Sequence, residues 1–238
     1  MVRETITVVF SLLLVIGLTA GCDGSDNVMS TEDDTQVEQL VELPEVSRES
    51  KMSVEESLEA RRSVREFSEE GLSIDEIGQL VWAAQGITEP ARGFRTAPSA
   101  GALYPLEVYV VTDKSRDEEL ESGVYRYLPN EHSLKKIIEE DKREELYEAA
   151  LRQDSIREAP VSIVITSVYE RVTQRYGDRG EIYAHIEVGH VAQNIYLQVE
   201  SLGLGTVIIG AFEDEEFKQI LNLEEGEEPL VILPVGRL

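Results

Sequence analysis

Two nearly continuous apolar runs of strand length constrain the fold of this chain more than any other feature. Leu106–Thr112 and Val161–Ser167 have the composition of buried strands, and the shorter run Gly123–Leu128 alternates apolar with polar residues. A helical pattern spans Glu139–Arg152, and a further strand is predicted at Val231–Val235. Because these helices and strands interleave without a regular β-α-β period, we predict an α+β sandwich rather than a doubly wound fold.

Capping signals mark the start of two further helices. Ser53–Glu56 and Ser73–Glu76 both have the form of a capping box, in which serine and glutamate side chains bond the free backbone N–H groups. The second helix is expected to run to Gly86. A longer helical pattern, Glu181–Leu202, is apolar nearly all round and ends at Gly203. We expect this helix to be buried, either centrally or between subunits.

The N-terminus has the pattern of a lipoprotein signal. Arg3 precedes the apolar run Ile6–Leu18, which is too short to span a bilayer comfortably, and Thr19–Gly21 places small residues before Cys22. Cys22 is the single cysteine, so it cannot form a disulfide within the chain. We expect residues 1–22 to be a signal peptide that ends at a lipidated Cys22, and the protein to be extracytoplasmic and membrane-anchored. An uncleaved anchor is the alternative.

Acidic residues dominate the composition of the remaining chain. Residues 23–49 are rich in Asp, Glu, Ser and Thr and lack sustained apolar periodicity, which predicts a flexible tether before a domain at 50–238. The formal net charge is −25 at pH 7, whereas a nucleic-acid partner requires a clustered positive surface. We therefore exclude nucleic-acid binding from the expected functions.

Arginines and a turn of small residues form a candidate site for an anionic, planar ligand. Arg61, Arg62, Arg65 and Arg237 are phosphate candidates, because a planar guanidinium donates two parallel hydrogen bonds. The turn Pro98–Gly101 has little side-chain bulk, so its backbone N–H groups can approach a flat ring, and its serine adds a hydroxyl. These are the needs of a flavin mononucleotide. Taken singly, the segments also fit a helix end with basic dipole partners and a plain turn before a strand.

Two other motifs have simpler interpretations. Gly203–Gly210 differs from a dinucleotide fingerprint because its third glycine comes late and its glycines precede an apolar strand. We interpret it as a helix stop and a buried strand, with Gly210 permitting close backbone approach. Glu187 and His190 have a spacing found in di-iron bundles, but those sites need two such pairs. We therefore predict no metal site and a hydrogen-bonded core role for His190.

From about Ser53 to Leu238 the chain resembles the nitroreductase-like superfamily of flavoproteins, and within it the SagB-type (thiazole/oxazole) dehydrogenase branch. The residues that carry the resemblance occur in the same order: Arg61–Phe67, Leu80–Ile87, Arg95–Pro105, Gly123–Tyr127, Glu187–Asn194 and Leu233–Arg237. The resemblance implies a sandwich with a central, mostly antiparallel sheet flanked by helices. It also implies a homodimer with a buried long helix.

The resemblance further implies that FMN lies in a groove at the dimer interface. One subunit would hold the ribityl chain and the phosphate through Arg61, Ser63, Arg65 and Arg237. The other would contact the cofactor through Pro98, Ser99, Ala100 and Gly101, and Gly210 would lie close to the ring. Azoline-oxidising members carry a Lys-Tyr pair where this chain has Arg175-Tyr176. Because an arginine stays charged, the replacement argues against azoline oxidation and leaves Tyr176 as the candidate proton donor.

We therefore expect a membrane-tethered FMN oxidoreductase that transfers hydride in two half-reactions through one flavin site. Two directions stay open: oxidation of an organic substrate, or reduction of a quinone, nitroaromatic or similar acceptor with NAD(P)H. Export would separate the protein from cytoplasmic partners and nicotinamide cofactors, so the electron donor is not assigned. The alternative from another class is a lipoprotein that retains the fold and binds a ligand or partner without turnover.

Overall fold

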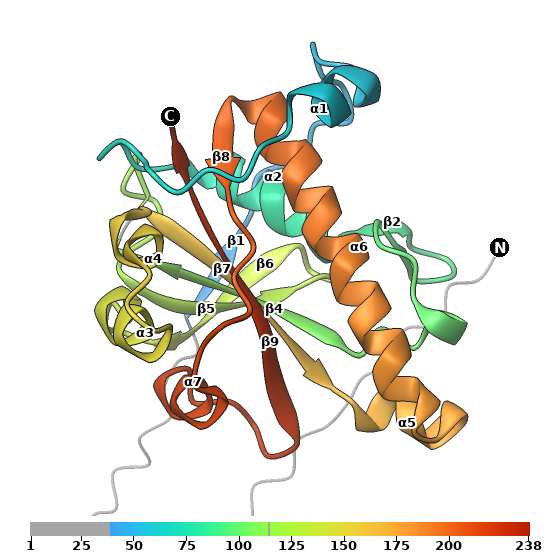
Figure 1. Cartoon of the computed structure of the whole chain (residues 1–238). Helices are drawn as coiled ribbons and strands as arrows, with labels where there is room; N and C mark the ends of the chain where they lie inside the picture. The colour runs from blue at the N-terminus through green and yellow to red at the C-terminus, as the bar shows by residue number, and fades with distance from the viewer. Residues whose placement is uncertain (1–38, 114) are drawn as a thin grey trace, which may run out of the picture. The chain divides into compact units, whose positions relative to one another are not determined.

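The computed structural model describes residues 39–113 and 115–238, which belong to one compact unit (Figure 1). The expected signal peptide with Cys22, and residues 23–38 of the expected tether, lie outside the described residues. Within the described ranges, no helix combines the length and the apolar character needed to cross a membrane.

An antiparallel sheet of seven strands forms the centre of the described part of the chain, with the order β1-β6-β5-β4-β7-β9-β8. Its strands are β1 (Leu40–Glu42), β4 (Leu106–Thr112), β5 (Gly123–Leu128), β6 (Ser133–Ile138), β7 (Val161–Val168), β8 (Leu204–Thr206) and β9 (Glu227–Arg237). A separate hairpin pairs β2 (Ile87–Glu89) with β3 (Phe94–Arg95). Pairing of Leu204 with Arg237 places the end of β9 beside the edge strand β8.

Helices cover both faces of the sheet. They are α1 (Val54–Ala60), α2 (Ile74–Gln85), the 3₁₀ turn η1 (Ala100–Ala102), α3 (Arg143–Ala149), α4 (Asp154–Glu158), α5 (Glu170–Tyr176), α6 (Arg179–Leu202) and α7 (Asp214–Ile220). α2 and α6 pack together on one face, and α3, α4 and α7 pack on the other (Figure 1). Side chains of successive strand residues point to opposite faces. Val108 therefore joins the core with Ile195 of α6, whereas Tyr109 joins the core with Phe217 of α7.

The predicted α+β architecture and mostly antiparallel sheet are confirmed. β4 and β5 have the predicted bounds, and α1 and α2 begin after Ser53 and Ser73, whose capping boxes both form. The helix predicted at Glu139–Arg152 is shorter and spans Arg143–Ala149, because Asp141 accepts the Arg143 N–H in the turn before it, and Leu151 and Arg152 after it have left-handed φ values of 55° and 60°. Several short elements were not predicted, since their segments lack a clear apolar period: β1, β2, β3, β6, α4, α5 and α7.

α6 is the longest helix of the described residues. It has 24 residues and ends at Leu202, and the next residue, Gly203, caps it with a left-handed φ of 68°, as the glycine stop predicted. One side packs on the sheet, but Ile182 and Ile186 on the other side are 44% and 51% exposed. The expectation of central burial is therefore wrong, and burial between subunits stays a prediction.

The sheet includes residues that the sequence assigned to the tether. Leu40–Glu42 pairs with β6 as an edge strand. Further on, the Ser47 N–H donates to Gln79 Oε1 at 2.9 Å, and Gln79 Nε2 donates to the Ser47 carbonyl at 3.0 Å. Because these backbone groups are paired with the domain, a tether that reaches Glu49 is not compatible with the structure. The folded domain already includes Leu40, which pairs with β6. The domain boundary expected at residue 50 is thus about ten residues too late.

Candidate functional site

The arginine-rich segment Arg61–Arg65 lies along the edge strand β8. Its Val64 N–H donates to the Thr206 carbonyl at 2.9 Å, and Ser63 forms a parallel bridge with the same residue. Gly205 permits this approach, because a Cβ atom there would lie 2.8 Å from the Val64 Cβ. The glycines after α6 thus end the helix and bring the arginine segment against β8.

Tyr196 connects this segment to α6. Its hydroxyl lies 3.2 Å from Ser63 Oγ and accepts the Ile208 N–H at 2.9 Å. The Arg61 guanidinium carbon stands 5.1 Å from the centroid of the Tyr196 ring, a distance at which a cation and an aromatic face attract. Sequence reasoning did not identify Tyr196, because only its position on the helix opposite β8 distinguishes it from a core aromatic residue.

The predicted phosphate arginines have different surroundings. Arg65 is exposed and has no hydrogen-bond or ion-pair partner among the described residues. Arg62 Nη1 instead donates to three carbonyl oxygens at the end of α1, those of Glu59, Ala60 and Arg61, at 2.9, 3.2 and 2.8 Å. Arg62 therefore closes the helix end, which is the simpler of its two sequence interpretations.

Arg237 is paired with acidic side chains at the start of α2. Its Nη2 donates to Glu76 Oε1 at 2.5 Å, and its Nε lies 3.0 Å from Glu70 Oε1. Glu76 is also the glutamate of the α2 capping box, which holds the Ser73 N–H. In this arrangement the charge of Arg237 is balanced within the chain.

The Pro98–Gly101 turn presents free backbone donors. The N–H groups of Ser99, Ala100 and Gly101 donate no hydrogen bond within the described residues, and Gly101 is exposed with a left-handed φ of 64°. The turn thus retains the open N–H groups that the sequence predicted.

Tyr176 and Arg175 lie directly against this turn in the same chain. A Cβ atom at Gly101 would stand 2.7 Å from the Tyr176 hydroxyl and 3.0 Å from Arg175 Nη1. The Tyr176 ring meets Tyr183 of α6 edge to face, with centroids 5.1 Å apart. The candidate proton donor is therefore positioned by α5 and α6 beside the predicted ring-binding turn.

The candidate site has two halves within one chain: the arginine segment Arg61–Arg65, and the Pro98–Gly101 turn with Tyr176. These two half-sites lie at different ends of α6. Tyr183 stands at the half-site of the turn, and Tyr196 at the half-site of the arginines. They are 13 residues apart in the sequence, which at 1.5 Å per residue is about 20 Å along the helix.

Gly210, the glycine expected close to the ring, is exposed at the end of the segment that follows β8. A Cβ atom there would lie 3.7 Å from the Leu230 carbonyl oxygen, which is ordinary contact. The chain itself therefore does not require glycine at this position. The exposed face at Gly210 lies two residues from Ile208, which is 39% exposed and adds apolar surface.

Glu187 is buried, whereas His190 is not. Glu187 is 2% exposed, and burial raises the pKa of its carboxyl. His190 is exposed, so its expected core role is wrong: Glu187, three residues earlier, takes the inward position on the helix. Within the described residues no cluster of His, Cys, Asp and Glu could hold a metal ion.

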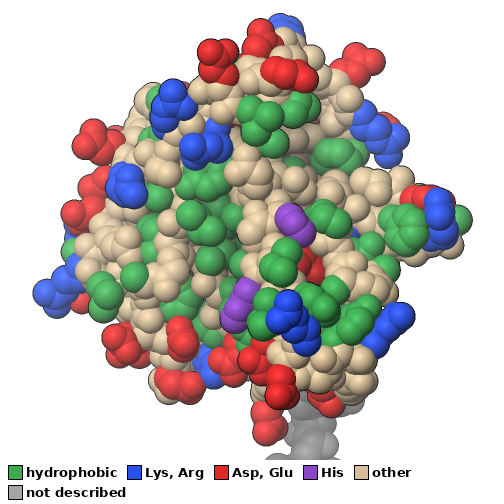
Figure 2. All heavy atoms as spheres, turned by 45° about the vertical axis from the view of Figure 1, so that its right-hand side comes forward, with side chains coloured by type: hydrophobic (Ala, Val, Ile, Leu, Met, Phe, Trp, Pro, Cys, Tyr) green, Lys and Arg blue, Asp and Glu red, His purple; other side chains and the backbone are tan. Residues whose placement is uncertain are grey.

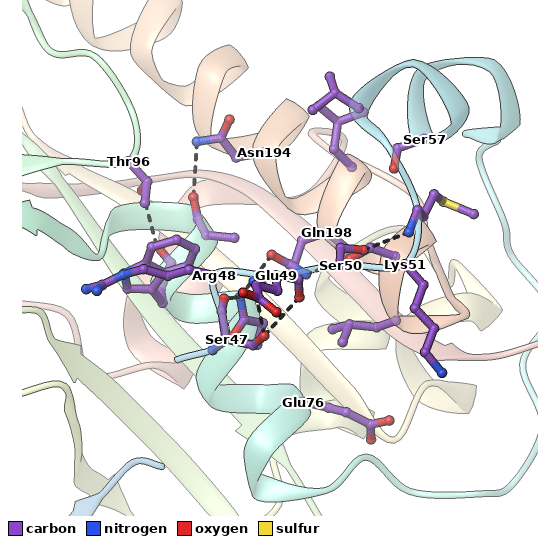
Figure 3. A pocket seen from close by; sticks show the side chains of 18 of the residues that line it. Ser47, Arg48, Glu49, Ser50, Lys51, Ser57, Glu76, Thr96, Asn194 and Gln198 are labelled. Carbon is purple, nitrogen blue, oxygen red and sulfur yellow. Dashed lines mark hydrogen bonds between the residues drawn. The ribbon is translucent and has the colours of Figure 1, made fainter. Parts of the chain in front are cut away.

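A cleft of about 900 Å³ lies on another side of α6, between α1, α2 and residues 45–52 (Figure 3). Trp82 lines this cleft, as do Thr96, whose hydroxyl donates to the Trp82 carbonyl, and Asn194, which donates to the Ala83 carbonyl. Trp82 therefore borders this cleft.

Hydrophobic side chains extend over one exposed face and surround histidine side chains there (Figure 2). α6 contributes Ile182 and Ile186 to the exposed surface, together with His185, whose Nε2 lies 2.6 Å from the Tyr169 hydroxyl. Further along the same helix, Gly189 is exposed, and a Cβ atom built there meets nothing within 4 Å.

Comparison with known proteins identifies the class to which this fold and site belong. The sequence matches the nitroreductase family over residues 58–237. A protein of Methanocaldococcus jannaschii named as a nitroreductase is 48% identical over 198 residues, which cover 83% of this chain and 96% of that protein. The chain therefore belongs to the nitroreductase family and is an oxidoreductase of that family.

A solved structure and a further relative agree with this assignment. A structure from Ralstonia eutropha JMP134, named as a nitroreductase, superposes with a TM-score of 0.74 and 31% identity, covering 84% of this chain and 90% of that one. The microcin B17-processing protein McbC of Escherichia coli is 29% identical over 166 residues, covering 68% of this chain and 61% of McbC. The predicted resemblance to the nitroreductase-like superfamily is confirmed, and the match to McbC supports its SagB-type branch.

Proposed function

We propose that the chain is an FMN-dependent oxidoreductase whose cofactor lies between two copies of the chain. The observation that carries the proposal is the position of the two half-sites at different ends of α6. An antiparallel pair of α6 helices related by a two-fold axis would bring Arg61–Arg65 of one copy close to Pro98–Gly101 of the other.

The exposed side of α6 supports such a pair. Ile182 and Ile186 are large apolar residues left in contact with water. Gly189 lies between the two half-sites, and its missing side chain serves no contact within the described chain. A glycine inside a helix costs about 0.5–1 kcal/mol relative to alanine, and close approach of a second helix gives this glycine a role.

The residues present suit the phosphate end of FMN. Arg65 is an unpaired cation, and Ser63 offers a hydroxyl next to it. Arg61 is held over the Tyr196 ring on the same segment. Two guanidinium groups and a hydroxyl form a suitable donor set for a phosphate dianion. Arg237 would join them only by leaving its glutamates, so its predicted phosphate role needs the separate test given below.

The other half-site suits the ring. The free N–H groups of the Pro98–Gly101 turn can donate to the polar edge of a flavin. Ile208 and Gly210, which follow β8 in the arginine half-site, are exposed and would leave apolar room for the flat face of the ring from the other copy. A bound flavin supplies the hydride transfer that these side chains cannot perform. The side chains of the protein would bind and orient the flavin and supply a proton to the substrate.

We assign proton donation to Tyr176. Its hydroxyl lies at the turn that would contact the ring, and the Arg175 guanidinium next to it is a fixed positive charge. An arginine stays protonated near neutral pH and cannot act as a base, so the proposal covers a small-molecule redox substrate and does not include azoline oxidation. Tyr176→Phe is expected to lower turnover at least tenfold with flavin still bound. Unchanged turnover would remove the assignment.

The visible spectrum of the purified full chain tests the proposal directly. We expect flavin absorption that bleaches with dithionite, about one FMN per chain released on heating, and a dimer by analytical ultracentrifugation. A colourless protein that takes up no added FMN would overturn the cofactor assignment. A yellow monomer would overturn the shared site.

We also propose that the protein is exported and attached to a membrane through lipid on Cys22. The apolar run before that cysteine and the small residues beside it support this proposal. Mass spectrometry of membrane-extracted protein should find a lipid-modified N-terminal cysteine. A free, unprocessed Met1 would contradict it.

A further inference from the structure

Two arginines beside the Pro98–Gly101 turn have no acidic partner. Arg175 lies in the last turn of α5 and places its Nη1 3.0 Å from the position that a Cβ atom at Gly101 would take. Arg179 is the first residue of α6. Both side chains are exposed, and neither forms a hydrogen bond or an ion pair with another described residue. Their guanidinium groups are therefore open to a ligand.

Aromatic contacts connect the two guanidinium groups. The Arg175 Cζ lies 5.4 Å from the centroid of the Tyr176 ring, and the Arg179 Cζ lies 5.9 Å from the centroid of the Tyr183 ring. The two rings meet edge to face, with centroids 5.1 Å apart. A cation and an aromatic face attract at such distances. The four side chains thus form one cluster at the turn, which we call the tyrosine–arginine cluster.

Arg171, on the same helix as Arg175, shows what the chain does with an arginine that it neutralises itself. Its Nη1 lies 2.5 Å from Glu107 Oε1 and donates to the Tyr104 carbonyl at 3.3 Å. Acidic partners are abundant, because the chain has 47 Asp and Glu residues against 22 Lys and Arg residues. The lack of an acidic partner at both arginines of the cluster therefore points to a ligand that supplies the negative charge.

Helix stability does not explain the position of Arg179. A cation at the start of a helix is opposed by the helix dipole, whereas one in the last turn is favoured. The dipole of α5 can therefore account for Arg175, but the dipole of α6 disfavours Arg179. Asp178 and Glu181 are its nearest acidic neighbours in the sequence, and neither makes an ion pair with it. Arg179 thus needs another reason for its charge.

An organic anion fits the chemistry of the cluster. A guanidinium can donate two parallel hydrogen bonds to a carboxylate. The formal net charge of −25 repels an anion at a distance, so local cations are needed where such a molecule is to bind. The Tyr176 hydroxyl lies beside these cations, since it stands 2.7 Å from the same Cβ position at Gly101.

We propose that Arg175 and Arg179 bind the carboxylate of an organic electron acceptor and make the enzyme selective for acidic over neutral acceptors. This inference rests on the proposed function, in which Tyr176 supplies the proton. A nitroaromatic acid gives a balanced example. Its nitro group takes a hydride from the reduced flavin and a proton from Tyr176, one N–O bond breaks, and a nitroso compound and water form.

A matched pair of probes tests the selectivity. para-Nitrobenzoate and para-nitrobenzamide have nearly the same shape and differ in charge, and neither is reduced by the oxidised protein. Isothermal titration calorimetry of the oxidised, FMN-bound full chain should find that the benzoate binds about tenfold more tightly than the benzamide. Arg175→Gln should reduce this ratio to within about twofold, and Arg179→Gln should reduce it severalfold. Arg175→Lys keeps the charge and should retain an intermediate ratio.

Arg157→Gln is the matched control. Arg157 also lies over a tyrosine ring, with its Cζ 4.2 Å from the Tyr147 centroid, but it is paired with Asp154 at 2.5 Å and belongs to α4 on the other face of the sheet. The variant changes the net charge of the protein as Arg175→Gln does. It should leave both the ratio of affinities and FMN binding unchanged.

Single-turnover oxidation of the reduced enzyme gives a second readout. Protein reduced with one equivalent of dithionite is mixed with each probe in a stopped-flow instrument, and the return of flavin absorption is followed. The loss of selectivity in Arg175→Gln should appear as a higher concentration of the benzoate at half-maximal rate, with the benzamide nearly unaffected. An equal loss with both probes, or a loss of FMN from this variant, would place Arg175 on the flavin or on Tyr176 and overturn the proposal.

The remaining outcomes also decide. Equal affinity of the wild type for the two probes, or an unchanged ratio in Arg175→Gln, would refute the selectivity. A wild type that binds no FMN would overturn the proposed function. The same titrations on the FMN-free chain then test the cluster, because it lies within one chain. A preference for the benzoate that disappears in Arg175→Gln would support it as an anion site, and no preference would refute it.

Discussion

The hydroxyl of Tyr196 lies 3.2 Å from the hydroxyl of Ser63, and the same Tyr196 oxygen accepts the Ile208 N–H at 2.9 Å. One side chain of α6 thus fixes the arginine segment and the backbone after β8 relative to each other. In the proposed site, the first would hold phosphate and the second would lie beside the ring.

Tyr196→Phe tests this connection. The variant keeps the ring under Arg61 but removes both hydroxyl contacts, so we expect the free energy of unfolding to fall by about 1–2 kcal/mol and FMN affinity to fall severalfold. Thermal melting and fluorescence titration with FMN measure the two effects. Tyr127→Phe is the control and should leave FMN affinity unchanged. It removes a hydroxyl contact to His132 in the turn between β5 and β6. Equal losses of affinity would disprove the special role of Tyr196.

The arginines should separate into binding and structural groups. Arg65→Ala removes an unpaired cation, so we expect FMN affinity to fall about tenfold or more and stability to stay nearly constant. Arg237→Ala removes one cation from Glu70 and Glu76, which keep Arg116 at 2.9 and 4.0 Å, so we expect it to lower the free energy of unfolding by about 1 kcal/mol or less. Fluorescence titration with FMN measures the affinity of both variants, and thermal melting measures their stability. A larger loss of FMN affinity in Arg237→Ala than in Arg65→Ala would return Arg237 to the phosphate site.

Gly101→Ala should disturb the site through Tyr176. The new Cβ would stand 2.7 Å from the Tyr176 hydroxyl at a left-handed φ, so the tyrosine must shift and the turn gains strain of about 1 kcal/mol or more. We expect a loss of FMN affinity and of turnover. Gly93→Ala is the matched control, because Gly93 has a similar φ of 66° and open space around its Cβ position. It should cost stability alone, and a similar effect of both variants on FMN would contradict the contact with Tyr176.

Glu227 should make stability depend on pH. The carboxyl is buried and accepts from Thr166 and from Tyr109 at 2.9 Å, and burial raises its pKa above the unfolded value of about 4.3. The remaining charged groups that act on it are Glu107 and Arg126. A raised folded pKa gives a stabilising contribution that is complete below the unfolded pKa and is lost as pH rises through the folded one.

Glu227→Gln removes this titration. Compared with the wild type, its free energy of unfolding should therefore improve as pH rises from about 4 to 8, measured by urea unfolding at several pH values. Glu225→Gln, an exposed change of the same charge in the preceding loop, should follow the wild-type profile. Parallel profiles for wild type and Glu227→Gln would show that Glu227 does not titrate in this range.

Local patterns in the sequence determined much of this protein. The apolar runs predicted β4 and β5 with their bounds, and the capping boxes at Ser53 and Ser73 predicted where α1 and α2 begin. Such signals act between residues a few positions apart, so they can be recognised without the fold. The motif order from Arg61 to Arg237 was likewise sufficient for the family, which the comparisons confirm.

Only the tertiary structure decided which of the candidate side chains are free to bind. Arg237 meets Glu76 across 161 positions of the chain, and Tyr196 meets Ser63 across 133. Leu40–Glu42 becomes a strand only because β6 offers it an edge. These contacts depend on sheet order and on the rotation of α6 about its axis, which no local pattern encodes. Sequence therefore proposed the binding residues, and packing determined that Arg65 stays open while Arg62 and Arg237 are engaged within the chain.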